Sequence, residues 1–118
     1  MNNTEYLEFL KKQENKNKTI VANAREDVDK AKKSLKNVQD QIPIWTNLIA
    51  LLHEEMVQSE VSEKRRELLS KQIDQYRELI KVLLEEVKSK TLDVVRAQGY
   101  LSGVKFLTRG ESQSQVID

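Results

Sequence analysis

The sequence predicts an all-α protein, either an elongated antiparallel coiled-coil hairpin or a slender three-helix bundle, and one that forms oligomers. Glycine (three) and proline (one) are scarce, and the turns of β proteins depend on such residues. Charged residues make up 33% of the chain and only 5% is aromatic, so large apolar groups are too few for a thick globular core. Apolar residues recur every three and four positions, which places them on one stripe of a helix.

The clearest repeat begins at Leu69 and ends at Val104. Its mean spacing of 3.5 residues is that of a coiled-coil seam, and only Lys90 interrupts it. The seam residues are Leu69, Ile73, Tyr76, Ile80, Leu83, Val87, Val94, Ala97, Leu101 and Val104. This repeat predicts a long helix over residues 62–106.

The first predicted helix covers residues 3–41. The same heptad spacing recurs from Val21 to Ile42, with small side chains at Ala24 and Ala31 that allow another helix to approach closely. Residues 13–19 are polar, so the helix either continues through them with a polar layer or breaks and restarts. The continuous helix is favoured, because no residue in this stretch forbids helical backbone.

Pro43 predicts the end of that first helix. Proline lacks a backbone N–H and disfavours helical geometry at the residue before it, but it suits the first turn of a following helix. The second predicted helix, 44–60, carries an apolar face wider than a coiled-coil seam. Such a face usually contacts more than one neighbour.

The connection to the third helix lies between residues 55 and 66. The heptad positions that precede Leu69 are polar here, so either the apolar stripe shifts within one long helix or the chain breaks near Ser59–Ser62. The break is favoured, with a serine capping the third helix. The prediction is then three helices, 3–41, 44–60 and 62–106.

The last predicted helix ends in an aromatic segment with two glycines, Gly99 and Gly103, four residues apart. They either permit close backbone approach or mark a fraying helix end, and fraying is favoured. Gly110 fits a helix stop. The sequence therefore predicts one helical coiled-coil domain over residues 1–107 and a disordered polar tail over residues 108–118.

Residue types that support catalysis or metal binding are almost missing. The chain has no cysteine, and its only histidine, His53, has no partner motif for a catalytic triad or a metal site. No phosphate-binding or dinucleotide-binding glycine motif is present. We expect no enzyme activity, no cofactor, no metal and no small-molecule substrate.

The location of the protein is predicted from its apolar runs. The longest nearly apolar run, 42–52, is about half the length that a membrane span requires. The N-terminal residues lack the basic and apolar regions of a signal peptide. We expect a cytoplasmic protein with no membrane partner.

The composition favours a non-enzymatic helical interaction protein: an assembly factor, adaptor or inhibitor that acts through protein–protein contacts and self-associates. Apolar residues outside the seams need a further partner, and exposed apolar stripes mark interaction sites. The predicted interface residues are Trp45, Leu48, Ile49, Leu52, Met56, Tyr100, Leu101, Val104, Phe106 and Leu107.

The alternative is a nucleic-acid-binding accessory protein that dimerises through its helices and contacts phosphates with basic patches. The candidate contacts are Lys30, Lys32, Lys33, Lys36, Lys64, Arg65 and Arg66. A net charge of only +1 and the acidic residues among these lysines favour a solvated charged face instead.

Overall fold

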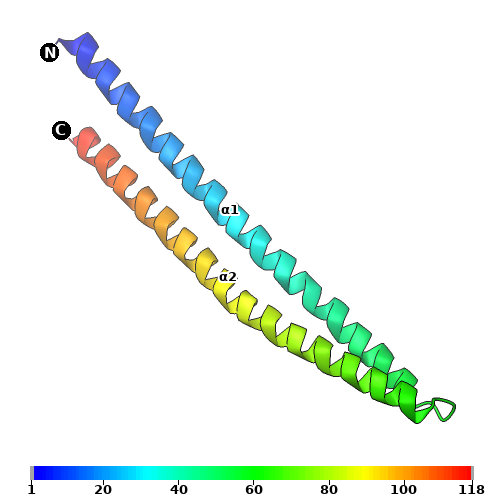
Figure 1. Cartoon of the computed structure of the whole chain (residues 1–118). Coiled ribbons are helices and arrows are strands. Elements are labelled where there is room, and N and C mark those ends of the chain that lie inside the picture. The colour runs from blue at the N-terminus through cyan, green and yellow to red at the C-terminus, as the bar shows by residue number, and fades with distance from the viewer. Residues whose placement is uncertain (1, 118) are drawn as a thin grey trace. The chain divides into compact units, whose positions relative to one another are not determined.

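The computed structural model describes the backbone of residues 2–117 and the side chains of residues 2–109. This part of the chain forms two α-helices and no strand: α1 spans Asn3–Met56 and α2 spans Glu63–Ile117 (Figure 1). The all-α prediction is confirmed. The predicted disordered tail, 108–118, falls mostly on residues whose side chains lie outside the described part, and it stays a prediction.

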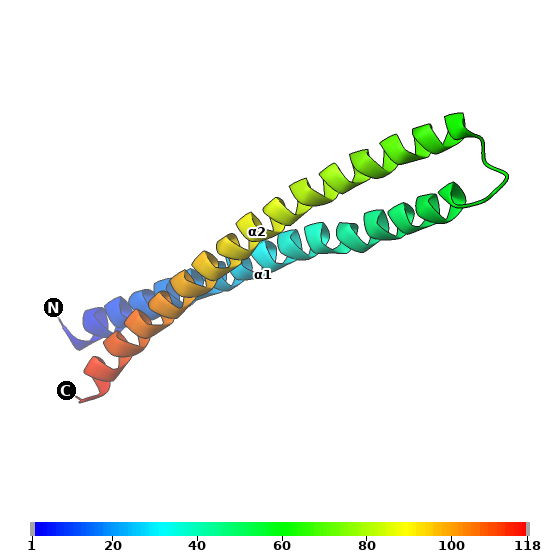
Figure 2. The same cartoon turned by 90° about the horizontal axis from the view of Figure 1, so that it is seen from below.

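The chain divides into two compact units, and both helices contribute to each of them. Unit 1 consists of Met1–Lys32 and Asp93–Asp118, and unit 2 consists of Lys33–Leu92. Unit 1 therefore pairs the first part of α1 with the last part of α2. Unit 2 is a helical hairpin that contains the connection between the two helices (Figure 2).

The start of α1 is fixed by reciprocal hydrogen bonds between Asn2 and Glu5. The Asn2 side-chain Oδ1 accepts from the Glu5 backbone N–H at 2.8 Å, and the Asn2 backbone N–H donates to Glu5 Oε2 at 3.4 Å. Both bonds satisfy donors that the first helical turn leaves free. The helix then continues through residues 13–19, with Gln13 and Asn17 half-buried. The predicted continuous helix with a polar layer is confirmed.

Pro43 does not end α1, and the predicted boundary between residues 41 and 44 is wrong. The proline lies inside the helix on an exposed face, and Gln39, whose carbonyl would accept from residue 43, is also exposed. Water can hydrogen-bond that carbonyl, which limits the cost of the missing N–H. Val38 is buried and Trp45 half-buried on the inner face, so packing holds the helix on both sides of the proline. The chain is therefore not a three-helix bundle.

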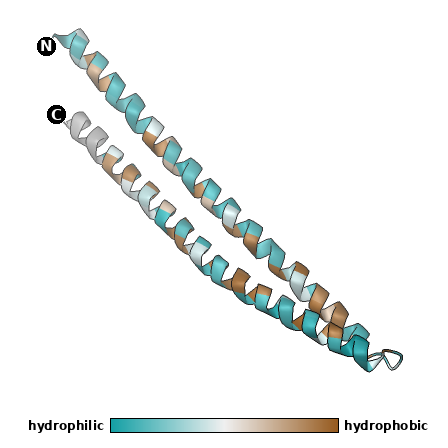
Figure 3. Ribbon diagram, viewed as in Figure 1, coloured by the Kyte–Doolittle hydropathy of each residue, from teal (hydrophilic) through white to brown (hydrophobic). Residues whose placement is uncertain are grey.

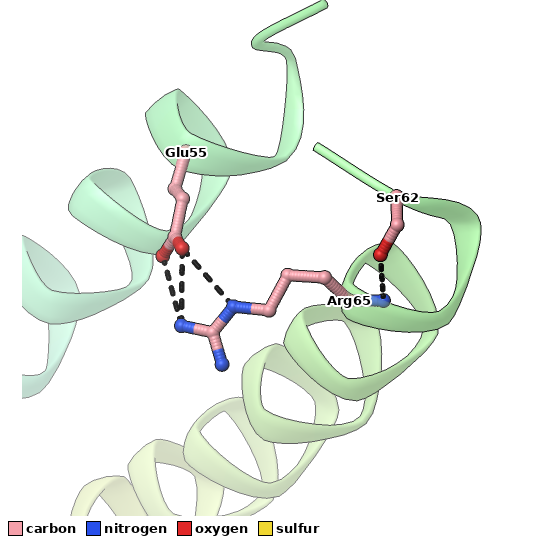
Figure 4. Close-up of polar contacts among 3 residues, drawn as sticks. All are labelled: Glu55, Ser62 and Arg65. Carbon is pink, nitrogen blue, oxygen red and sulfur yellow. Dashed lines mark hydrogen bonds and ion pairs between the residues drawn. The ribbon is translucent and has the colours of Figure 1, made fainter. Parts of the chain in front are cut away.

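The predicted break near Ser59–Ser62 is confirmed. Residues 57–62 form the connection between α1 and α2, and the Ser62 side-chain Oγ accepts a hydrogen bond from the Arg65 backbone N–H at 3.2 Å (Figure 4). This is the geometry of a helix N-cap. Arg66 Nη2 donates to the Gln58 carbonyl oxygen at 3.1 Å and holds the turn against the start of α2.

Replacing Ser62 by alanine removes this cap, and we expect the free energy of unfolding to fall by about 1 kcal/mol. Urea unfolding followed by circular dichroism measures the loss. Ser89 provides the matched control, because it is exposed and lies in the interior of α2. Ser89→Ala should leave stability unchanged or raise it slightly, since alanine is the better helix former. Equal effects of the two variants contradict a capping role for Ser62.

An ion pair joins α1 and α2 beside the turn of unit 2. The guanidinium of Arg65 contacts both carboxylate oxygens of Glu55, with Nε 3.1 Å from Oε1, Nη2 3.0 Å from Oε1 and Nη2 3.3 Å from Oε2 (Figure 4). Such a forked contact fixes orientation better than a single hydrogen bond. Both side chains remain partly solvated, so the pair contributes no more than about 1 kcal/mol. It also shows which sides of the two helices adjoin.

The core of unit 2 is one row of apolar side chains between its two helices. Val38 from α1 and Leu69, Ile73 and Leu83 from α2 are buried, and Leu69 is 0% exposed. The Trp45 ring packs against that of Tyr76 with centroids 5.1 Å apart and planes inclined by 47°. The predicted seam of α2 is confirmed in this unit, because its buried residues are seam residues.

Unit 1 has a thinner core. Over residues 2–32 and 93–109, its buried apolar side chains are Ala24 and Val28 from α1 and Val94 from α2. Ala24 is a small seam residue, as expected where helices approach closely. Leu101 and Val104 are half-buried, which extends the seam of α2 into this unit.

The last helix extends further than predicted, because α2 is helical to Ile117 and not only to residue 106. Gly99 and Gly103 lie inside it, and a side-chain Cβ placed on either of them would meet no atom within 4 Å. Neither glycine is therefore required by close backbone approach within this chain. Both lie on an exposed face of α2.

Candidate protein interface

One side of unit 2, over residues 34–55 of α1 and 65–82 of α2, carries no charge apart from the Glu55–Arg65 ion pair, and the exposed Glu86 ends this stretch on α2. Residues three and four positions apart share a helix face, so the face that carries Glu55 on α1 and the face that carries Arg65 on α2 can be followed along each helix. On α1, the face of Glu55 also carries Leu51, Leu48, Ile44, Gln41, Asn37 and Ser34. On α2, the face of Arg65 also carries Leu68, Gln72, Gln75, Leu79 and Val82. We call these residues, which adjoin because Glu55 contacts Arg65, the uncharged side.

The apolar members of the uncharged side are accessible. Ile44 is 58%, Leu51 60%, Leu68 52% and Val82 61% exposed. Leu48 and Leu79 are half-buried and lie between these residues and the seam. Apolar residues concentrate in the part of α1 near the turn and in the middle of α2 (Figure 3). The uncharged side is therefore an exposed apolar surface built by two helices.

The borders of the uncharged side are charged. Asp40 and Glu54 lie beside it on α1, and Lys71 and Glu78 lie beside it on α2. All four are exposed. An apolar centre depleted of charge and surrounded by a charged rim is the composition of protein–protein interfaces.

The other side of unit 2 differs in composition and is marked by a contact between His53 and Arg77. Their Nε2 and Nη2 atoms are 3.2 Å apart, and because a guanidinium only donates, His53 Nε2 is the acceptor in this contact. The faces that continue from these two residues include the charged side chains of Lys36, Asp74, Lys81 and Lys88. Charge is thus distributed unequally between the two sides of the hairpin.

A second exposed apolar face lies on α2 in unit 1. Tyr100, Phe106 and Leu107 are 60%, 76% and 66% exposed. Gly99 and Gly103 lie among them at helical spacing, with open space above both. Large apolar side chains around bare backbone give this face an uneven relief that a neighbouring helix can fill.

Some of the predicted interface residues are half-buried between the helices, and others are exposed. Five of them line unit 2 and are half-buried: Trp45, Leu48, Ile49, Leu52 and Met56. In unit 1, Leu101 and Val104 are half-buried, whereas Tyr100, Phe106 and Leu107 are exposed. Much of the predicted Trp45–Met56 face is therefore used for packing within unit 2, and Trp45 itself contacts Tyr76.

Sequence reasoning missed three accessible residues in unit 2: Ile44, Leu51 and Leu68. Each lies one position before a residue of the seam or the broad face, so a count of seam positions passes over it. The available signal was the absence of charge along a helix face. Once Glu55 and Arg65 are known to be in contact, the uncharged face of α1 and the uncharged face of α2 can be recognised as one surface.

The predicted nucleic-acid contacts are partly occupied by interactions within the chain. Lys30 forms an ion pair with Glu26 at 3.2 Å, Arg65 contacts Glu55, and Arg66 donates to the turn. Lys32, Lys33, Lys36 and Lys64 are exposed. Two of the three consecutive basic residues 64–66 thus stabilise the connection between the helices.

Two further features of the described residues bear on chemistry and location. No group of three or more histidine, aspartate or glutamate side chains among them could hold a metal ion. Neither helix, over the residues described, contains an apolar stretch long enough to cross a membrane.

Comparisons of the chain with protein-family models, with curated proteins and with solved structures find no match.

Proposed function

We propose that this chain is a non-enzymatic helical interaction protein that acts through protein–protein contacts, as an assembly factor, adaptor or inhibitor. The observation that carries this proposal is the uncharged side of unit 2, where exposed Ile44, Leu51, Leu68 and Val82 adjoin in a chain of which 33% is charged. Contiguous exposed apolar surface with a polar rim is typical of interaction sites.

The chemistry of this surface favours protein over nucleic acid or lipid as the partner. Phosphate groups require lysine or arginine at the contact, and the only cation on the uncharged side, Arg65, is paired with Glu55. A helix that lies on an anionic membrane carries lysine and arginine beside its apolar face. The rim of this surface is instead of mixed sign, with Asp40 and Glu54 on α1 and Lys71 and Glu78 on α2.

The apolar face of unit 1 supports the same function. Aromatic side chains are enriched among residues that contribute most to binding between proteins. Tyr100 and Phe106 are both exposed, and helix packing within the chain does not require the glycines beside them. This face offers a second contact surface.

Photo-crosslinking in the cells that produce the protein tests the proposal. A photoreactive amino acid replaces Leu51 or Tyr100, and matched controls carry it at Ala50 or Gln98, which are exposed on other faces of the same helices. We expect adducts of defined mass at Leu51 and Tyr100 that survive nuclease and disappear with protease. Adducts that nuclease removes would support the nucleic-acid alternative, and equal background at all four positions contradicts a protein-binding role for these faces.

A further inference from the structure

We propose that the uncharged side binds the uncharged side of a second copy of this chain, so that two unit 2 hairpins form a four-helix contact. The inference rests on the proposed function and specifies its partner. It assigns the contact to the faces of Leu51 and Val82 and not to the opposite side of unit 2. The contact is isologous: the same surface is presented by both copies.

The charge distribution makes this surface compatible with itself. In a two-fold contact each residue at the axis meets its own copy, so a charge placed there meets a like charge and is repelled. The uncharged side avoids this problem, since Glu55 and Arg65 neutralise each other and the other positions of residues 34–55 and 65–82 on this side carry no formal charge; the first unpaired charge, Glu86, lies beyond its end. The whole chain has a net charge of only +1, so repulsion between two copies is also small at long range.

The polar residues of this side are also able to pair with themselves. Ser34, Asn37, Gln41, Gln72 and Gln75 carry hydroxyl or amide groups. A hydroxyl or side-chain amide both donates and accepts hydrogen bonds, so a second copy presents the complementary group. Lysine or aspartate at the two-fold axis would instead face an identical charge.

The size of the uncharged side reaches what a stable dimer needs. Residues 34–55 of α1 extend for about 30 Å at 1.5 Å per residue, and two adjoining helices are about 20 Å wide. This surface measures about 600 Å² per copy, and about 1,200 Å² for both copies, which is the lower limit for specific interfaces. A contact of this area binds reversibly, so the dimer should dissociate on dilution.

Light scattering on a sizing column, over a range of concentrations, measures the association directly. We expect the wild-type mass to rise from that of the 13.7 kDa chain to twice that value. Leu51→Glu places two unpaired carboxylates in the proposed contact, one from each copy. We expect it to raise the dimer dissociation constant at least about 10-fold. Because Leu51 is exposed, the helix content measured by circular dichroism should remain unchanged.

Leu84→Glu is the matched control, because Leu84 is 46% exposed and lies on the side of unit 2 that carries Arg77. We expect Leu84→Glu to dimerise as the wild type does. A wild-type chain that stays monomeric at every concentration overturns the proposal, and so does an equal effect of the two substitutions. A dimer that neither substitution weakens overturns it as well, because another face then makes the contact.

Single-cysteine variants locate the interface. The chain has no cysteine, so a short bismaleimide joins two molecules only through the introduced residue. We expect covalent dimers with Leu51→Cys, with Val82→Cys or with an equimolar mixture of the two, according to which residue lies near the two-fold axis, but not with Leu84→Cys, and the reverse pattern overturns the proposal. Failure of the dimer proposal alone leaves the Tyr100 photo-crosslinks unaffected, whereas failure of the proposed function removes the adducts at both Leu51 and Tyr100. The two failures can therefore be distinguished.

Discussion

Leu69→Ala is expected to lower the free energy of unfolding by about 3 kcal/mol, within the usual range for truncating a buried leucine. Leu69 is the largest side chain that is fully buried among the described residues, with 0% exposure. It lies in the seam of unit 2, where a single row of apolar side chains forms the core. A narrow core has few neighbours that can collapse into the cavity, so most of the lost contact energy is not recovered.

Urea unfolding followed by circular dichroism measures this loss. Leu92→Ala is the matched control, because Leu92 lies in the same helix and unit but is 54% exposed. We expect that control to stay within about 0.5 kcal/mol of the wild type. Similar losses for the two variants contradict the position of the seam in unit 2.

Pro43→Ala is expected to raise the free energy of unfolding by about 2 kcal/mol. Proline inside a helix costs about 3 kcal/mol relative to alanine, and its restriction of the unfolded chain returns at most about 1 kcal/mol. The substitution gives residue 43 an N–H that can donate to the carbonyl of Gln39. Because Pro43 is exposed, no cavity is created in exchange.

The same unfolding measurement tests this gain. Asn47→Ala, one turn further along α1 at another exposed position, controls for the general preference of helices for alanine and should add only about 0.5 kcal/mol. A Pro43→Ala variant no more stable than the Asn47→Ala variant contradicts a helix that continues through residue 43.

The sequence predicted the seams and the turn because both depend on local spacing. Apolar positions from Leu69 to Val104 follow one repeat, and that repeat fails where the chain turns at residues 57–62. The error at Pro43 has a different origin. The rule that proline ends a helix considers residue 43 alone. Val38 and Trp45, on either side of Pro43, pack on the inner face and hold the helix together.

The candidate interface could be predicted only in part. The width of the apolar face after Pro43 indicated more than one neighbour, and the structure shows that α2 packs against the part of it that includes Trp45. Which edge remains accessible depends on the rotation of α1 against α2, and sequence spacing does not give this angle. The contact between Glu55 and Arg65 fixes it, and with it the surface that carries Ile44 and Leu51.

The ring contact between Trp45 and Tyr76 provides a natural spectroscopic probe. Trp45 is the only tryptophan of the chain, and it packs against the other helix within unit 2. Its fluorescence therefore reports separation of the helices in that unit, whereas circular dichroism reports helix content throughout the chain. Superimposable curves from the two signals indicate one cooperative transition, and displaced curves indicate that the two units melt as separate folding units.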